Sequence, residues 1–415
     1  MPPPPVPVVV AHVFPVLRRL HHGTSLGSCV NDDRYQLLPV SRPHVANMGD
    51  QKHRFLILGG TGFVGRHLVD HLLKSDVASK IRVVDKVPPQ MAWLNSAHKE
   101  LYENPTVEFK SANLINPASC KAAFEDPEGP YDFVINLAAE TKINLPDCVY
   151  EEGILKLSRN CAREALGHRP KRYIEVSSGH MYAEGKKPAQ EHFPLEPWTV
   201  TAQLKLAVEE DLQEMKDLDY VILRPAIVYG VADKHGIVPR ILVGAVYKHL
   251  KETMKLLWTK DLKMDTVHVL DLCRAIWHVC LHGKSGDVYN VVDQGHTTQG
   301  KVTEIISERF SISHSYWGTA ASLIAKTDME STVEQVNEKH LSPWAEACLK
   351  DNITNTPLSP YLCQELLTDR NLCLDGSKLV GTGFTYLVPE MTKERINEIV
   401  EDYVEMGLFP RSLLR

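Results

Sequence analysis

The feature that most restricts the fold of this chain is a glycine triplet between a strand-like and a helix-like segment. The apolar run Phe55–Leu58 comes first, and three regularly spaced glycines follow it: Gly59, Gly62 and Gly65. Behind this turn, apolar residues recur on one helical face: Val64, Leu68 and Leu72. Because glycine has no Cβ, the turn can be tight and can bring backbone amides and a helix N-terminus close to a phosphate. The triplet therefore predicts a strand–turn–helix unit that binds the pyrophosphate of a dinucleotide.

From residue 54 onward, short apolar runs alternate with amphipathic stretches. The runs predict six strands, at Phe55–Leu58, Ile81–Val84, Val107–Phe109, Phe133–Ile135, Tyr173–Val176 and Tyr220–Leu223. Helices are expected over 151–166 and 199–216. Alternation of this kind is typical of a parallel sheet with helices on both faces. The predicted fold class is therefore α/β, a Rossmann-type doubly wound parallel sheet.

An acidic residue stands where such a fold recognises the adenosine ribose. Asp85 follows Gly65 by 20 residues and comes at the end of the second expected strand. Its carboxylate can accept hydrogen bonds from both ribose hydroxyls and would repel a 2′-phosphate, which favours NAD over NADP. The neighbouring Lys86 argues in the other direction, because a cation there could hold a phosphate.

The remainder of the chain is less regular. Helical pieces at 317–350 and 391–406 are bounded or interrupted by prolines. We expect residues 48–232 to form the NAD-binding Rossmann domain. Residues 233–415 should be mainly a smaller, mixed substrate-side region with elements that return to the Rossmann core. Residues 1–47 begin with prolines at positions 2–5, and both a disordered tail and a weak mitochondrial targeting segment remain open for them.

Further motifs over residues 54–300 resemble the extended short-chain dehydrogenase/reductase family, the NAD-dependent epimerases and dehydratases. They are Asn136–Ala139 after the fourth strand, Ser177–Tyr182 after the fifth, and Leu223–Gly230 at the sixth. The resemblance implies NAD as the cofactor. It also implies a set of cofactor-binding residues: Gly59, Gly62, Phe63, Val64, Gly65, Asp85, Asn113, Leu114, Leu137, Ala138, Ala139, Lys205 and Pro225.

The same resemblance breaks at the catalytic pair. The family uses a serine or threonine, matched here by Ser178, together with Y-x-x-x-K on the following helix. Four residues place the tyrosine and lysine on one helical face, where the lysine holds the nicotinamide ribose and lowers the tyrosine pKa. Lys205 matches the lysine, but Thr201 stands in place of the tyrosine. A threonine hydroxyl holds its proton too tightly for acid–base work near neutral pH.

Other polar residues offer weaker alternatives. His180 and Tyr182 flank Ser178 and could supply a substitute acid, although the simpler interpretation is that Tyr182 packs in the pocket wall and His180 is a polar lining residue. Asp271 is expected to cap the N-terminus of a late helix. Histidines and cysteines show no metal-ligand spacing, so no metal is expected.

Composition and net charge restrict the classes of partner that we expect for this chain. A net charge of −6 predicts no nucleic-acid surface, and no apolar stretch has the length of a membrane span. Nine scattered cysteines favour reduced thiols inside the cell; the cytoplasm is the expected compartment, with mitochondria the alternative. The family resemblance implies pairing through helices 151–166 and 199–216, so a homodimer or a subunit of a larger assembly is expected.

Two functions follow from this sequence. The first is a non-catalytic or weakly catalytic NAD-binding protein that serves as a sensor, regulatory or assembly subunit. The second is an active oxidoreductase, epimerase or dehydratase that acts on a nucleotide sugar or similar hydroxyl compound. Lys205, His180, Tyr182 or a bound water would then supply the proton. The intact glycine loop beside Thr201 favours the first function, whereas the retained Ser178 and Lys205 favour the second.

Overall fold

The central element is a parallel sheet of seven strands. The structure, a computed structural model, describes residues 52–185 and 187–414, and these belong to one compact unit. The strands are β1 (His53–Leu58), β2 (Ala78–Asp85), β3 (Val107–Ser111), β4 (Phe133–Asn136), β5 (Arg172–Val176), β6 (Tyr220–Pro225) and β10 (Val288–Val291). Their order in the sheet is β10-β6-β5-β4-β1-β2-β3. The predicted doubly wound Rossmann-type sheet is therefore confirmed, and β10 adds a seventh strand from the region that seemed irregular.

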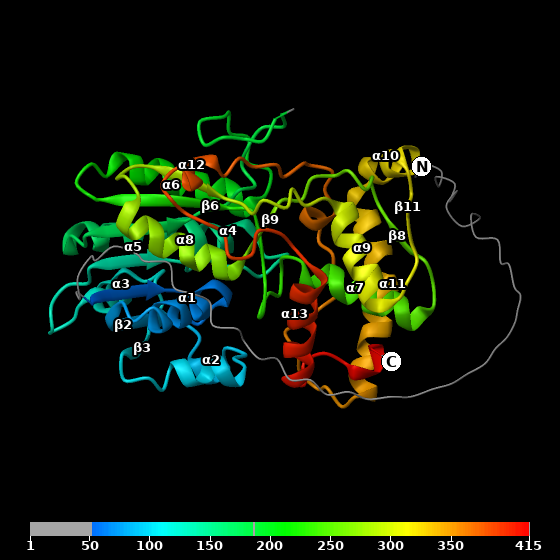
Figure 1. The fold of residues 1–415 in the computed structure, drawn as a ribbon, viewed down its shortest axis with the longest axis horizontal. Coiled ribbons are helices and arrows are strands. Elements are labelled where there is room, and N and C mark those ends of the chain that lie inside the picture. Colours follow the sequence, from blue (N-terminus) through cyan, green and yellow to red (C-terminus); the bar gives the residue numbers. More distant parts are fainter. Residues whose placement is uncertain (1–51, 186, 415) are drawn as a thin grey trace, which may run out of the picture. The chain divides into compact units, whose positions relative to one another are not determined.

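Helices cover both faces of this sheet (Figure 1). Alternate residues of β1 point to opposite faces, as a strand requires. Phe55 and Ile57 pack with α1 (Phe63–Lys74) and α8 (Val269–His282). Leu56 and Leu58 belong to the core that contains α3 (Pro117–Phe124), α5 (Leu157–His168) and α6 (Val200–Glu214). The apolar run that opens the chain's periodic part is thus buried on both sides.

The expected helix over 151–166 is divided. It consists of α4 (Asp147–Tyr150), the π-helical turn η2 (Glu151–Lys156) and α5. Gly153 lies in the π-helical turn, where a Cβ would come 2.7 Å from the Glu140 side chain. The close approach of Glu140 thus requires the glycine. The other predicted helix, 199–216, is confirmed as α6.

A second apolar core lies beside the sheet. It is built by α7 (Val238–Leu250), α9 (Gln299–Phe310), α11 (Met329–Lys350) and α13 (Lys393–Glu405), which are grouped at the right of Figure 1. The expected helical pieces correspond to α10 (Thr319–Thr327) with α11, and to α13. The boundary expected near residue 232 stays a prediction. The expectations for residues 1–47 lie outside the described residues.

Shorter elements complete the described part. They are α2 (Ser96–Leu101), α12 (Ser377–Val380), the 3-10 turns η1 (Pro89–Met91), η3 (Gln364–Leu367) and η4 (Arg411–Leu413), and the strand pairs β7 (Ile227–Tyr229) with β9 (Thr266–His268) and β8 (Met254–Leu256) with β11 (His314–Tyr316). Among the described residues, no helix has both the length and the apolarity that a membrane crossing requires.

The expected role of Asp271 was wrong. His268 is the N-cap of α8, and its ring accepts a hydrogen bond from the Leu270 amide. Asp271 lies in the first turn of α8 and is fully buried. Its two carboxylate oxygens accept the amides of Leu387 and Val388, each at 2.7 Å. Asp271 therefore anchors the C-terminal segment to α8, which local sequence could not reveal because the partners are more than 100 residues away.

Candidate dinucleotide and active site

The glycine loop lies at the point where the order of the strands reverses. Leu58 pairs with Val84 on one side and with Asn136 on the other, so the carboxyl ends of β1, β2 and β4 share one edge. The loops that follow β1 and β4 leave a sheet at such a point toward opposite faces, which creates the usual dinucleotide crevice. The predicted glycine loop is therefore in the position that binding requires.

Each glycine of the triplet has its own structural reason. Gly59 has a φ of +78°, and a Cβ there would lie 2.7 Å from the Ala138 amide nitrogen. A Cβ on Gly65 would lie 2.5 Å from the Cα of Gly60, so α1 and the turn pack backbone to backbone. Gly62 is exposed and is the N-cap of α1. The first amides of α1, which have no partner within a helix, thus remain free for a pyrophosphate, and the loop fits the expected cofactor.

Arg66 fixes the shape of this loop and was not identified from the sequence. Its buried guanidinium donates hydrogen bonds to the carbonyl oxygens of Gly62, Thr61, Ala92 and Trp93 at 2.7–3.1 Å. Burial lowers the pKa of Arg66. An arginine near the start of a helix is common, so the sequence alone does not indicate this role. The role of Arg66 is visible only from its partners in the folded structure.

Asp85, which is expected to bind the adenosine ribose, also accepts hydrogen bonds from backbone amides at the glycine loop. One carboxylate oxygen accepts the Thr61 amide at 3.2 Å, and the other accepts the Val87 amide at 3.0 Å. Each oxygen retains a lone pair, so these bonds do not prevent contact with a ribose. Lys86 donates to Glu140 at 3.0 Å, which pairs this neighbouring cation with a carboxylate on the opposite loop.

The remaining expected cofactor residues are spread around this edge. Ala138 and Pro225 are buried, Phe63, Val64, Leu137 and Ala139 are half-buried, Asn113 is exposed, and Leu114 belongs to the apolar core. Asn113 and Leu114 follow β3, where the Asn113 side chain accepts the Ile115 amide. Direct contact of these residues with a cofactor stays a prediction.

Ser178 and His180 form a small polar pair after β5. The Ser178 hydroxyl lies 3.3 Å from the His180 Nδ1 atom and also accepts the His180 amide. Removal from water lowers the pKa of His180 to about 4, and the nearby Arg240 guanidinium acts in the same direction. His180 is therefore neutral near pH 7 and is a poor proton donor.

Tyr182, the second candidate for a substitute proton donor, is buried, and its hydroxyl is hydrogen-bonded within the protein. Its hydroxyl donates to the Asn290 side chain at 2.6 Å and accepts a hydrogen bond from Arg224 at 2.8 Å. Burial raises the pKa of Tyr182 to about 12, although Arg224 opposes this shift. The hydroxyl has neither a free donor position nor a pKa suited to proton transfer near neutral pH.

Thr201 and Lys205 lie on α6, one helical turn apart, as the sequence predicts. Thr201 is half-buried, whereas Lys205 is almost fully buried. The Lys205 ammonium donates to the carboxylate of Glu175 at 2.8 Å. Glu175 lies in β5 and is completely buried. Sequence reasoning missed this residue, although a charge between Ile174 and Val176 in an apolar strand was a visible signal.

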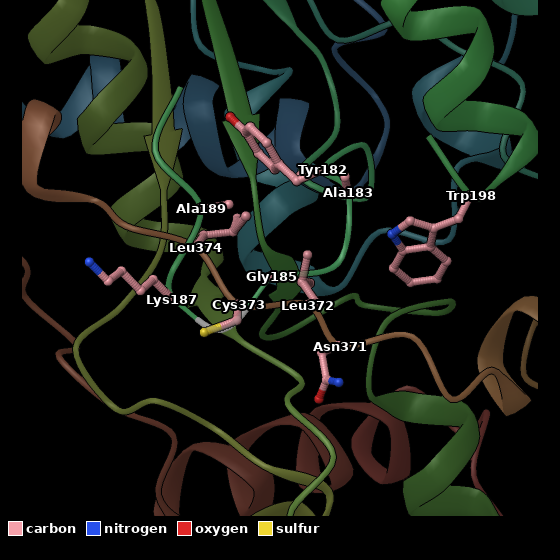
Figure 2. A pocket seen from close by; sticks show the side chains of 11 residues that line it. Tyr182, Ala183, Gly185, Lys187, Ala189, Trp198, Asn371, Leu372, Cys373 and Leu374 are labelled. Carbon is pink, nitrogen blue, oxygen red and sulfur yellow. The ribbon is translucent and has the colours of Figure 1, made fainter. Parts of the chain in front are cut away.

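A cavity of about 20 Å³ lies beside the serine segment, which is room for about one water. Figure 2 shows Tyr182, Ala183 and Gly185 on one side of it and residues 371–374 of the C-terminal part on the other. Gly179 also lines this cavity, and a Cβ there would approach the Leu374 side chain to 2.8 Å. The C-terminal segment thus packs directly on the serine segment.

Together, the fold and the glycine loop define a nucleotide-binding protein of the Rossmann class. Residues 55–292 match the model of the NAD dependent epimerase/dehydratase family, and the chain belongs to this family. The predicted family is thereby confirmed. The prediction of NAD is confirmed at the level of the family, whose description names it.

Similar proteins include two sugar-nucleotide dehydratases and an epimerase. The chain is 25% identical over 273 residues to dTDP-glucose 4,6-dehydratase of Actinoplanes sp., covering 61% of this chain and 81% of the relative. It is 23% identical over 369 residues to dTDP-D-glucose 4,6-dehydratase of Homo sapiens, covering 85% and 90%. The structure of Thermus thermophilus UDP-glucose 4-epimerase with NAD superimposes with a TM-score of 0.60 at 19% identity, covering 85% and 99%. This structural likeness shows the shared fold.

Proposed function

We propose that this chain binds NAD in the crevice between the loops after β1 and β4 and turns over substrate weakly or not at all. Its role would then be that of a sensor, a regulatory protein or a subunit of an assembly. The glycine loop and the first turn of α1 would hold the pyrophosphate, and Asp85 would meet the adenosine ribose. When bound, NAD supplies hydride chemistry; the question is whether this chain can move the accompanying proton.

The observation that carries this proposal is that none of the candidate donors Thr201, His180 and Tyr182 is suited to exchange a proton beside Ser178. Thr201 occupies the position of the family's tyrosine, and its hydroxyl is far too weak an acid to exchange a proton near pH 7. His180, with a pKa of about 4, is neutral at that pH. The Tyr182 hydroxyl is bound to Asn290 and Arg224. The three candidate donors are therefore each unsuited, for different physical reasons.

A sugar dehydratase would need two acid–base groups in addition to the hydride acceptor. Elimination of water beside a carbonyl requires one group to remove a proton from carbon and another to protonate the departing hydroxyl. The two residues after Ser178 are Gly179 and His180, so this segment provides no carboxylate. The chemistry named by the dehydratase relatives therefore lacks an acid–base pair on this segment.

The second candidate is an active enzyme on a nucleotide sugar, the substrate class named by the relatives. The contact between Ser178 and His180 favours it, because a neutral imidazole can accept a proton from the serine hydroxyl. With a pKa of about 4, however, His180 is also a weak base. We therefore place this function second.

Calorimetric titration with NAD, together with turnover assays on dTDP-glucose and UDP-glucose, tests the proposal. We expect measurable NAD binding by the wild type and its loss in Gly62→Val, because a side chain there fills the space that the pyrophosphate needs. Conversion of either sugar nucleotide to product should be absent or very slow. Robust wild-type turnover would overturn the proposal and favour the active enzyme.

A further inference from the structure

A buried polar cluster lies between the sheet and helices α5 and α6. At its centre is the Glu175 carboxylate, which is completely buried. One oxygen accepts Lys205 at 2.8 Å and Ser158 at 3.2 Å. The other accepts the Asn136 amide and the Tyr173 hydroxyl, each at 2.8 Å. Four donors from β4, β5, α5 and α6 therefore converge on a single carboxylate.

Such a carboxylate needs a cation. Moving a charged group out of water is costly unless a partner of opposite charge and hydrogen bonds compensate it. Ser158, Asn136 and Tyr173 are neutral, so they satisfy lone pairs but not the charge. Among the ion pairs of the described residues, the partner of Glu175 is Lys205, which is itself almost fully buried.

We infer that Lys205 is the structural counter-ion of Glu175, and that Glu175 is a positioning residue that keeps this ammonium in the layer between sheet and helices. This assignment departs from the prediction that Lys205 holds the nicotinamide ribose. It also explains why the lysine is present although Thr201 has replaced its tyrosine partner. The lysine is required to neutralise a buried acid, whether or not proton transfer takes place.

The inference deepens the proposed function and rests on it only where NAD affinity is used as a readout. If Lys205 is a counter-ion, its presence no longer argues for catalysis. Both residues of the family's tyrosine–lysine pair would then be unavailable for proton transfer. The tyrosine is replaced by Thr201, and Lys205 is paired with Glu175.

A set of variants of the full chain tests the inference by thermal melting. Lys205→Met leaves a buried, unpaired carboxylate, so we expect the melting temperature to fall by roughly 5–10 °C. Lys205→Met combined with Glu175→Gln removes both charges and keeps hydrogen-bonding groups, so it should recover most of that loss. Lys205→Arg keeps the ion pair and should melt close to wild type. Lys156→Met is the matched control, because Lys156 pairs with Glu152 at the surface, and it should melt like wild type.

NAD affinity separates the counter-ion from a cofactor ligand. In the double variant we expect the NAD dissociation constant to change by less than fivefold, because the ammonium does not carry cofactor binding. A weakening of fivefold or more would overturn the inference, as would a double variant no more stable than Lys205→Met. Should the double variant fail to fold, the same fivefold limit applies to Lys205→Arg. If wild type binds no NAD, the proposed function fails, while the melting cycle still decides whether the ion pair is structural.

Discussion

At the scale of single residues, the proposed loss of catalysis depends on Thr201 and Glu175. Thr201 leaves α6 without a phenol one helical turn before Lys205, where the family resemblance implies a tyrosine. Glu175 places a negative charge 2.8 Å from the ammonium that would otherwise lower the pKa of such a phenol. The two features act on the same proton, so restoring one of them should restore only part of the function.

Thr201→Tyr is expected to produce slow oxidation of dTDP-glucose or UDP-glucose where wild type shows almost none. General acid–base assistance typically contributes about 10²–10⁴-fold, and we expect the lower end because Glu175 offsets the charge of Lys205. The rate of product formation from the sugar nucleotide is the measurement, because epimerisation and dehydration return the hydride to the sugar and leave no net NADH. Thr201→Phe is the matched control, since it adds the ring without the hydroxyl. Equal rates for the tyrosine and phenylalanine variants would show that the phenol proton is not what the site lacks.

Glu140→Gln is expected to improve NADP binding by roughly fivefold, equivalent to about 1 kcal/mol. Glu140 holds the Lys86 ammonium at 3.0 Å, and its loss frees that cation for a 2′-phosphate beside Asp85. Asp85 still repels the phosphate, so NAD should remain the preferred cofactor. Calorimetry with both dinucleotides measures the change. Adding Lys86→Met should cancel the gain, and a gain that survives this second change would contradict the explanation.

At the scale of elements, the parts that the sequence predicts are those with strong periodicity. Apart from the edge strand β3, the expected strands are largely buried apolar runs, and this pattern can be recognised without tertiary information. Helix α7 was not predicted, because seven consecutive buried residues, Ile241–Tyr247, form one apolar run that conceals its helical period. Among the expected site residues, the glycine loop lies as predicted because its geometry is local. Glu175 and Arg66 were missed because their partners come from distant segments.

The anchor at Asp271 gives a prediction at this scale. Asp271→Asn replaces an acceptor oxygen by an amide that cannot accept the Leu387 or Val388 backbone amide, inside a fully buried site. We expect a loss of about 2–3 kcal/mol in the free energy of unfolding, measured by urea denaturation. Asp217→Asn, the same change at an exposed position, is the control and should be near neutral. A near-neutral Asp271→Asn would show that the C-terminal segment is held by its apolar contacts alone.

At the scale of the whole molecule, stability should depend on three buried histidines around α1. His67 and His98 have ring centroids 4.7 Å apart, and His268 caps α8 nearby. All three are buried. Burial lowers the pKa of His67 to about 4 and those of His98 and His268 to about 3. The unfolded chain takes up these protons near pH 6.5, but the native protein does not, so stability present above pH 6.5 is lost as the pH falls toward 4.

The slope of the unfolding free energy against pH tests whether these histidines cause the loss of stability. Each proton bound only by the unfolded chain corresponds to about 1.4 kcal/mol of unfolding free energy per pH unit between roughly pH 6 and 4.5. His98→Phe keeps an aromatic ring and removes one titrating group whose Nδ1 atom is buried without a partner among the described residues. Its slope, from urea denaturation at several pH values, should be smaller than that of wild type by about 1.4 kcal/mol per pH unit, the contribution of one proton. His249→Phe changes an exposed histidine and should leave the slope unchanged. Parallel curves for wild type and His98→Phe would mean that His98 is protonated in the native state, and that the aromatic packing around α1 tolerates the charge.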